Sequence, residues 1–267
     1  DLMPAWAVNA NIYEVNIRQY TPEGTFNAFA EHLDRLNNMG VKMLWLMPIY
    51  PISTTKKKGS LGSYYAVSDY TAVNPEFGTA EDFKNLVDKI HTLDMKVILD
   101  WVPNHTGWDH VWIEDHPEYF THVADTITHP FMNGEPTDWY DVAELDFDNM
   151  DMREEMTQAL EYWITEYDVD GYRCDVAFEV PDDYWDSAVS RMRAIKPVFM
   201  LAEAEHPPHR NSGNFHMSYP WSFMHLTNEI GKGVEDVNAI DKYLLENAEK
   251  FSKGFQMSFT TNHDENS

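Results

Sequence analysis

Short apolar runs alternate along the chain with longer stretches in which apolar residues recur every three or four positions. The short runs predict β-strands and the longer, amphipathic stretches predict helices. The expected strands are residues 11–17, 43–47, 96–102, 169–174, 198–202, 215–217 and 255–261. The expected helices are residues 25–39, 81–93, 152–167, 182–195 and 237–251. This alternation predicts parallel β-α units.

The expected strands are short, single and apolar, which is typical of strands buried on both faces. About seven β-α units in a chain of 267 residues favour a barrel over an open, doubly wound sheet. A doubly wound sheet would usually carry a glycine-rich turn after its first strand, and residues 17–20 contain no glycine. The sequence therefore predicts an α/β fold, a (β/α)8 TIM barrel.

Residues 106–145 show no clear periodicity and scatter tryptophans among His, Pro, Asp and Gly. A loop of this length inside a compact domain is usually functional or a small subdomain. We therefore expect a short inserted subdomain at 106–145 after the third strand, between a first part of the barrel at 1–105 and a second part at 146–267. The loop at 53–63 is expected to be exposed, with its lysines solvated.

The net charge is −26 at pH 7, which argues against binding nucleic acid or an anionic membrane surface, because both require a basic face. The single cysteine, Cys174, excludes an internal disulfide and is expected to be a buried apolar residue. No apolar run reaches the length of a membrane span. The N-terminus lacks a basic, then apolar, signal pattern, and the start at Asp1 without Met is what removal of a leader would leave. The acidic composition favours a secreted or periplasmic location, with the cytoplasm as the alternative.

Polar residues gather after four of the predicted strands. The clusters are residues 100–105, residues 173–175, Glu203 and residues 262–264. In a barrel the C-terminal strand ends meet at one mouth, where active sites form. Because unpaired buried charge is costly, four such clusters at one rim indicate a catalytic site.

Three carboxylates could face a substrate there: Asp175, Glu203 and Asp264. Arg173 and Asp175 lie two positions apart on a strand and project to one face, and an arginine beside a carboxylate favours its ionised form. Asp175 is therefore the natural nucleophile. Glu203 follows an apolar run, where burial would raise its pKa and suit a general acid. Such carboxylate pairs point to glycoside chemistry.

Two histidines, His105 and His263, can hydrogen-bond sugar hydroxyls. They are not spaced as a zinc pair, and no third ligand of the usual type accompanies them.

Taken in order, these residues resemble the α-amylase family of retaining glycoside hydrolases and transglycosylases. The matching motifs are Asp100-x-Val102-x-Asn104-His105, Gly171-Tyr172-Arg173-x-Asp175, Glu203 after an apolar strand, Phe259-x-x-Asn262-His263-Asp264, Tyr65-x-x-x-Asp69-Tyr70 and Glu144-Leu145-Asp146. Each motif alone is modest, and the ordered set is highly specific.

The resemblance implies a role for each matching residue. Asp175 would be the nucleophile, Glu203 the acid/base, and Asp264 the stabiliser of the transition state. The residues expected to hold the nucleophile or the sugar next to the cleaved bond are Arg173, Tyr65, His105 and His263. The implied reaction is retaining hydrolysis of α-glucosidic bonds in starch-like α-glucans through a covalent glycosyl-Asp intermediate.

Two departures from the family's pattern affect these expectations. Many amylases carry a Lys-His pair after the nucleophile, where this chain has Phe178 and Glu179. The pair contributes to a family calcium site, for which Asn104 and Glu144 remain here as expected ligands of one structural Ca²⁺. The chain also stops at Ser267, before an eighth β-α unit and the family's C-terminal β-domain, so we expect a fragment that lacks the C-terminal part of a longer protein.

Two alternatives stay open. A transglycosylase or isomerase would use the same site with a different acceptor. A non-catalytic sugar-binding fragment is the alternative from another class, although its expected loss of one of the three carboxylates is not found.

Overall fold

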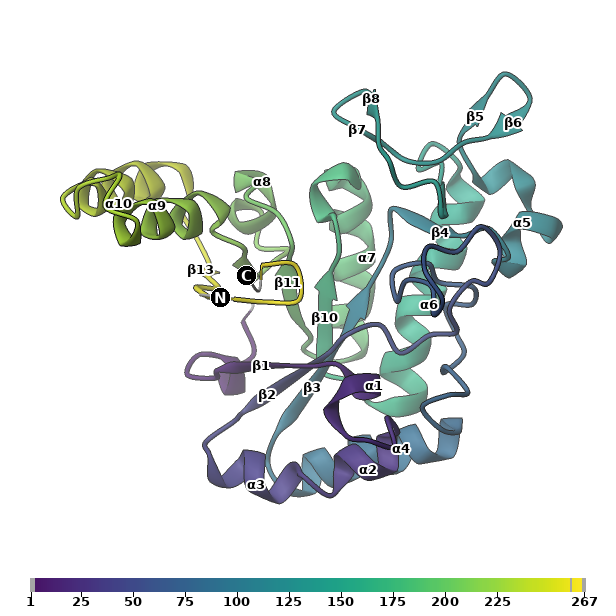
Figure 1. The fold of residues 1–267 in the computed structure, drawn as a ribbon, viewed down its shortest axis with the longest axis horizontal. Coiled ribbons are helices and arrows are strands. Elements are labelled where there is room, and N and C mark those ends of the chain that lie inside the picture. The colour runs from purple at the N-terminus through teal and green to yellow at the C-terminus, as the bar shows by residue number, and fades with distance from the viewer. Residues whose placement is uncertain (1–2, 260, 266–267) are drawn as a thin grey trace.

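A computed structural model describes residues 3–259 and 261–265. Its main sheet has seven strands, all parallel. The strands lie side by side in the same order in which they follow one another along the sequence. In spatial order these strands are β1 (Ile12–Val15), β2 (Met43–Leu46), β3 (Lys96–Trp101), β10 (Gly171–Cys174), β11 (Phe199–Ala202), β12 (Met217–Ser218) and β13 (Phe255–Gln256). This arrangement of parallel β-α units confirms the predicted barrel fold (Figure 1).

Burial explains why the central strands read as continuous apolar runs. Every residue of β2, β10 and β11 is buried, as expected for strands covered on both faces. Parallel pairing sets Arg173 of β10 opposite Asp100 of β3 and opposite Leu201 of β11. The register therefore brings the polar residues of neighbouring strands to one level of the sheet.

Helices connect the strands and cover the sheet. They are α1 (Ile17–Tyr20), α2 (Phe26–Ala30), α3 (Leu33–Asn38), α4 (Ala80–Thr92), α5 (Val111–Asp115), α6 (Met150–Tyr167), α7 (Asp182–Ile195), α8 (Pro207–Asn211), α9 (Trp221–Gly231) and α10 (Ala239–Lys250). Single 3-10 turns lie at η1 (Ala5–Ala7), η2 (Pro117–Tyr119) and η3 (Ala177–Glu179). Helix α4 starts with a capping box between Thr79 and Asp82, which satisfies its first free N–H groups.

Several boundaries differ from the sequence-based expectations. The expected helix at 25–39 is two helices, α2 and α3, and the expected strand at 215–217 is β12, shifted towards the C-terminus. The expected strand at 255–261 is shortened to β13, and its residue 260 lies outside the described residues. Helix α9 was not predicted, although Pro220 precedes it and Phe223, Leu226 and Ile230 recur at helical spacing.

The segment after β3 folds into three small antiparallel sheets. They pair β4 (His105–Gly107) with β9 (Val142–Glu144), β5 (His122–Val123) with β6 (Thr126–Ile127), and β7 (Phe131–Met132) with β8 (Glu135–Pro136). The last two pairs project as hairpins at one corner of the molecule (Figure 1). The division of the chain at 106–145 stays a prediction, and the first of these strands begins at His105.

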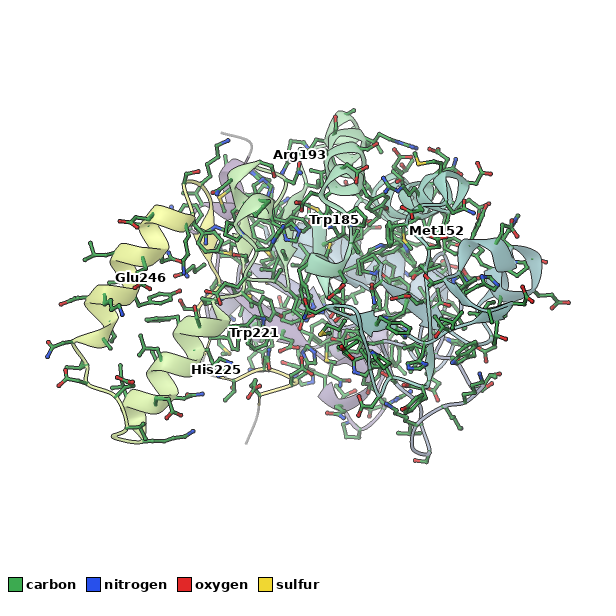
Figure 2. The ribbon with its side chains drawn as sticks, turned by 90° about the horizontal axis from the view of Figure 1, so that it is seen from above. Met152, Trp185, Arg193, Trp221, His225 and Glu246 are labelled. Carbon is green, nitrogen blue, oxygen red and sulfur yellow. The ribbon has the colours of Figure 1, made fainter. Side chains whose placement is uncertain are left out.

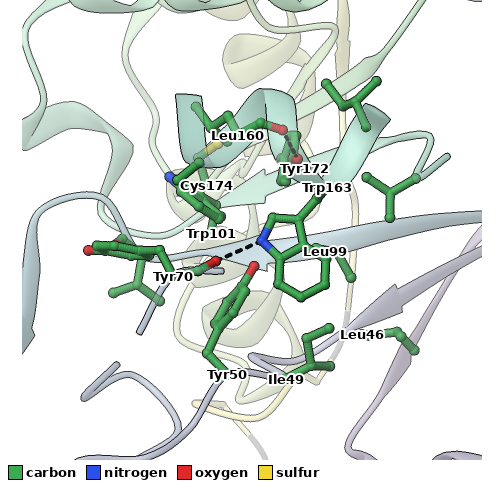
Figure 3. Packing of buried hydrophobic residues seen from close by; sticks show 14 of the residues in the cluster. Leu46, Ile49, Tyr50, Tyr70, Leu99, Trp101, Leu160, Trp163, Tyr172 and Cys174 are labelled. Atoms are coloured by element: carbon green, nitrogen blue, oxygen red, sulfur yellow. Dashed lines mark hydrogen bonds between the residues drawn. The ribbon is translucent and has the colours of Figure 1, made fainter. Parts of the chain in front are cut away.

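Aromatic side chains close the core between the sheet and α6. Trp163 of α6 donates a 2.7 Å hydrogen bond from Nε1 to the carbonyl oxygen of Tyr70, and the Tyr172 hydroxyl donates at 2.6 Å to that of Leu160 (Figure 3). Both polar groups are thus satisfied inside an apolar environment. Cys174 lies in the same cluster and is fully buried, as predicted.

Helices α9 and α10 lie at one end of the molecule, where His225 and Glu246 lie away from the core around Trp185 (Figure 2). Trp221, at the start of α9, still packs against a buried cluster that includes Tyr219. Helix α10 has no buried residue. Among residues 3–259 and 261–265, no helix combines the length and the apolar character needed to cross a membrane. The expectations of a removed leader and of a missing C-terminal part are based on Asp1 and Ser267. Both residues lie outside the described residues.

Candidate active site

The Arg173 guanidinium lies at the centre of the polar cluster. It is fully buried, and its Nη1 lies 2.9 Å from Asp175 Oδ1 and 3.0 Å from Asp100 Oδ1. Its Nη2 lies 3.2 Å from Glu203 Oε2, and its Nε donates a 3.2 Å hydrogen bond to the Tyr219 hydroxyl. One cation therefore joins carboxylates from the ends of three neighbouring strands.

Asp100 is the most deeply buried carboxylate of this cluster and contacts Arg173, Trp45 and Tyr65. Its carboxylate is fully buried and accepts two hydrogen bonds of 3.0 Å at Oδ2, from Trp45 Nε1 and from the Tyr65 hydroxyl. Burial raises the pKa of Asp100 to about 6, and the charge of Arg173 opposes that rise. The sequence motif contained Asp100, but no role was predicted for it; the register of β3 against β10 sets it opposite Arg173.

The two carboxyl groups predicted to carry the chemistry, those of Asp175 and Glu203, lie side by side. Burial raises the pKa of Glu203 to about 7, against the charge of Arg173. A hydrogen bond between the two carboxyl groups further raises the pKa of Glu203 and lowers that of Asp175. Glu203 is therefore the proton donor of the pair.

Burial also raises the pKa of Asp175 above its ordinary value, and the charge of Asp100 adds to the rise. The pairing of Arg173 with Asp175 forms as the sequence indicated, but it does not by itself lower the pKa of Asp175. Desolvation of a buried carboxylate outweighs it.

The backbone after Asp175 helps to hold Glu203. Val176 has φ of 44°, a left-handed conformation that a β-branched residue rarely adopts, and its N–H donates a 2.9 Å hydrogen bond to Glu203 Oε2. The N–H of Glu203 in turn donates to the carbonyl oxygen of Cys174 at 3.0 Å. Strained backbone of this kind is typical of functional sites, where the surrounding structure compensates for its cost.

His263 closes the opposite side of the cluster. Its Nδ1 lies 2.6 Å from Glu14 Oε1, and its Nε2 lies 2.9 Å from the Tyr65 hydroxyl and 3.2 Å from Asp264 Oδ2. Burial disfavours the charged ring, but the hydrogen bonds with Asp264 and Glu14 outweigh it and raise the pKa of His263 to about 10. The same contact with His263 lowers the pKa of Asp264. His263 is therefore a cation at neutral pH.

A cavity of about 590 Å³ opens above these groups. Its lining residues are Lys58, Gly62, Ser63, Tyr65, His105, Met132, Trp139, Asp141, Val142, Asp175, Val176, Phe178, Glu203, His263 and Asp264. The structure thus gathers in one cavity all the predicted catalytic residues and the predicted sugar-binding residues other than Arg173, which lies buried beneath it. A concave space with aromatic walls and a few converging polar groups is the usual form of a small-molecule site.

His105 and Lys58 complete two sides of the cavity. Burial lowers the pKa of His105 to about 4, so its imidazole is neutral and can both donate and accept a hydrogen bond. The loop lysines are exposed, as expected, and Lys58 also lines the cavity. Its Nζ donates to the Asp138 carbonyl oxygen at 2.8 Å and lies 3.3 Å from Asp141 Oδ1.

The expected calcium ligands, Asn104 and Glu144, lie on neighbouring segments, since His105 pairs with Glu144 between β4 and β9. Glu144 Oε1 accepts a 3.0 Å hydrogen bond from the N–H of Phe131, and the Asn104 amide nitrogen lies 3.3 Å from His105 Nδ1. Two such side chains supply only part of the six to eight oxygen ligands that Ca²⁺ takes, roughly a quarter to a third. The calcium site stays a prediction, which a calcium-dependent shift in melting temperature would test.

Three residues of the site were missed by reasoning from the sequence. Glu14 pairs with His263, Trp45 donates to Asp100, and Tyr219 binds Arg173. Glu14 and Trp45 lie within predicted strands, where alternation alone cannot tell a residue of the barrel interior from one that faces the helices. Tyr219 follows β12, whose position was predicted about two residues early.

Comparisons with known proteins agree with this fold. A family model described as "Alpha amylase, catalytic domain" matches residues 8–144. The crystal structure of an α-amylase from Lactobacillus plantarum matches with a TM-score of 0.88 and 36% sequence identity, over 96% of this chain and 63% of that chain. Alpha-amylase 3 of Dictyoglomus thermophilum is 34% identical over 226 residues, which cover 74% of this chain and 44% of that protein.

An α-1,4-glucan:maltose-1-phosphate maltosyltransferase of Arcanobacterium haemolyticum is 31% identical over 264 residues, which cover 90% of this chain and 36% of that protein. The fold and these matches place the chain among the barrel-fold glycoside hydrolases and transglycosylases. Within that class, the chain belongs to the α-amylase family. It spans less than half the length of either of these two curated relatives.

Proposed function

We propose that this chain carries the active site of a retaining α-glucan hydrolase, with Asp175 as nucleophile and Glu203 as general acid/base. The observation that carries the proposal is the shared contact of both carboxyl groups with Arg173, at 2.9 Å and 3.2 Å. In retaining glycosidases the two carboxyl groups are about 5–5.5 Å apart, whereas inverting enzymes leave about 6.5–9.5 Å for a water molecule. Carboxyl groups that hydrogen-bond each other leave no room for a water molecule between them, which argues against the inverting arrangement.

The reaction has two steps. Asp175 attacks the anomeric carbon while Glu203 gives its proton to the departing glycosidic oxygen, which leaves with the electron pair of the broken bond. Glu203, now ionised, then takes a proton from water, and the water oxygen displaces Asp175 from the anomeric carbon. Two inversions at that carbon preserve its configuration. Asp264 would stabilise the positive charge that develops on the sugar.

The cavity walls suit a sugar ring. Tyr65 and Trp139 line the cavity with aromatic rings, and the neutral His105 can donate to or accept from a hydroxyl group. Both ring nitrogens of His263 already contact Glu14, Tyr65 or Asp264, so a sugar hydroxyl would have to replace one of these contacts. Phe178 lines the cavity at the place where the family often has a lysine, so the contact beyond the cleaved bond is apolar here.

The alternative is transfer of the glycosyl group to a sugar acceptor instead of water. It uses the same two carboxyl groups and differs only in which nucleophile enters the second step. The match to a protein named as a maltosyltransferase supports keeping it as the second candidate.

One further expectation concerns the location of the protein. Secretion or a periplasmic location stays a prediction.

The test measures reducing-sugar release from soluble starch and from maltooligosaccharides by the wild type, Asp175→Asn and Glu203→Gln. A matched control is Asp241→Asn, an exposed aspartate of α10 far from the cavity. The proposal requires activity in the wild type and the control, and a loss of at least about 1,000-fold in Asp175→Asn. The products should first appear as the α-anomer by NMR.

Unchanged activity in Asp175→Asn would contradict the assignment of the nucleophile, and a β-anomeric first product would contradict retention. Products longer than the substrate, formed only when a maltose acceptor is added, would favour the transglycosylase. The same assay on a longer chain that supplies the C-terminal part distinguishes an incomplete barrel from a different substrate.

A further inference from the structure

Three potential metal ligands meet outside the cavity, at the start of α7 and α8. Asp182 is the first residue of α7. His206 immediately precedes α8, and His209 lies in the first turn of that helix. His206 Nε2 lies 3.2 Å from Asp182 Oδ2, and His209 Nε2 lies 3.4 Å from Asp182 Oδ1. One ligand atom from each residue lies within 4.8 Å of the others.

His209 is the second observation that points to a ligand. Its side chain is 1% exposed, and within the described part of the chain neither of its ring nitrogens has a hydrogen-bond partner. A buried polar atom without a partner costs about 1–3 kcal/mol. In native proteins such an atom often marks the place where an ion or a water molecule binds.

We propose that Asp182, His206 and His209 bind a divalent transition-metal ion of the zinc class. Ligand atoms about 2.0–2.2 Å from a tetrahedral zinc ion are separated by about 3.3 Å. Each of the two histidines has a nitrogen at about this distance from a different oxygen of Asp182, and one ligand atom from each residue lies within 4.8 Å of the others, so binding an ion would draw the three side chains slightly closer together. Two imidazole ligands favour zinc, nickel or copper over calcium, which prefers oxygen. Three protein ligands leave a fourth position for water.

The surroundings suit metal entry and binding. The side chains of Asp182 and His206 are 50% and 37% exposed, so two of the three ligands are open to solvent, whereas His209 is buried. Metal ligands of the histidine type bind through the neutral imidazole, so binding at this site should weaken as the pH falls. The ring of His209 packs at 4.8 Å from that of Phe215, and its backbone carbonyl accepts from the Phe215 N–H at 3.0 Å, which fixes the ligand in place.

The site would join the two loops that hold the acid/base residue. Asp182 ends the loop that starts at Val176, and His206 ends the loop that starts at Glu203. These are the same two loops that the hydrogen bond from the Val176 N–H to Glu203 connects on the cavity side. A metal ion would therefore fix them at a second point, on the side away from the sugar.

The test is metal binding to chelator-treated protein that carries no polyhistidine tag. We expect one Zn²⁺ per chain by calorimetry, and Co²⁺ should give the visible absorption of a tetrahedral site. Zinc at about a hundredfold excess over its dissociation constant should raise the melting temperature by roughly 5 °C. His206→Gln and Asp182→Asn should bind at least about 100-fold more weakly. His225→Gln, a substitution of an exposed histidine on α9, is the matched control and should bind as the wild type does (Figure 2).

Each possible outcome decides the proposal. No binding by the folded wild type, or equal binding by His206→Gln and the wild type, would overturn it. Stronger stabilisation by Ca²⁺ than by Zn²⁺ would overturn the assignment to a transition metal. Both variants replace partly exposed side chains, so we expect both to fold. Their melting temperatures without metal check this. The readouts need no substrate and therefore do not depend on the proposed hydrolase activity.

Discussion

Glu14 of β1 holds the Nδ1 of His263 at 2.6 Å, across 249 positions of the chain. This contact and the one with Asp264 keep the His263 ring charged. We predict that Glu14→Gln lowers the pKa of His263 from about 10 by about one unit, because a hydrogen bond to a charged partner is worth about 1.5–3 kcal/mol and one pKa unit equals about 1.4 kcal/mol. An NMR titration of the ring measures this.

Glu31→Gln, at an exposed position, is the control for the removal of one negative charge and should leave the pKa of His263 unchanged. If the pKa of His263 is the same in Glu14→Gln and the wild type, Glu14 does not stabilise the charged ring.

Glu203 should make the folded protein less stable as the pH rises. Its pKa is about 7 in the folded state and 4.5 in its ordinary state, so the folded chain binds more protons between these values. The contribution of Glu203 to stability is full below pH 4.5 and is lost as the pH rises through about 7. We compare the unfolding free energy of Glu203→Gln with that of the wild type at pH 5 and at pH 8. The variant should be more stable relative to the wild type at pH 8 than at pH 5, by on the order of 3 kcal/mol.

Urea unfolding at both pH values measures this difference, with the exposed Glu249→Gln as the control. A constant difference between Glu203→Gln and the wild type across this range would show that the pKa of Glu203 is not raised.

Asp100→Asn should destabilise the fold strongly. The substitution leaves the buried Arg173 without one of its carboxylate partners, and breaking a buried pair costs about 3–5 kcal/mol. Asp88→Asn breaks an exposed pair with Lys84 one turn away and should cost at most about 0.5 kcal/mol. Similar losses for the two variants in chemical denaturation would contradict a structural role for Asp100.

Gly171 cannot carry a side chain. A Cβ atom there would lie 1.9 Å from the carbonyl oxygen of Phe199 on the neighbouring strand, and φ is 152°. We predict that Gly171→Ala costs more than about 4 kcal/mol or prevents folding. Gly40→Ala is the matched control, because its φ is 90° but nothing lies within 4 Å of the added atom. It should cost only about 1–2 kcal/mol, and equal stability of the two variants would show that the strands can separate at Gly171.

The sequence predicted the strands best where burial is complete. The runs at β2, β10 and β11 are apolar throughout, so their position was clear, and the polar residues at their ends identified the rim of the barrel. The shorter β12 and β13, with two residues each, have partly exposed positions and gave no sharp boundary. Helix α9 was missed because only one of its residues, Met224, is buried, so its apolar positions form no clear stripe.

The candidate site was predictable where chemistry and strand ends coincide, as for Asp175 and Glu203. The site was not predictable where a residue contacts another residue that is distant in the sequence. Nothing in the sequence around Glu14 shows that it meets His263, and nothing around Asp182 shows that it meets His209, because both contacts depend on how distant units pack. The pKa of Asp175 was also misjudged, since the sequence shows the neighbouring arginine but not the degree of desolvation.

The chain order of the sheet has a consequence for synthesis. Because each strand pairs with the strand before it, every new β-α unit leaves the ribosome with its neighbour already made. The pairing of His263 with Glu14 is the opposite case, since it joins the first strand to residues beyond the last one. Tyr65, Asp100 and Arg173 can assemble while the chain is still growing, whereas the His263 side of the cavity can form only after β13 and the residues that follow it have been made. This wall of the cavity therefore depends on a contact between the first strand and the residues after the last described strand of the sheet.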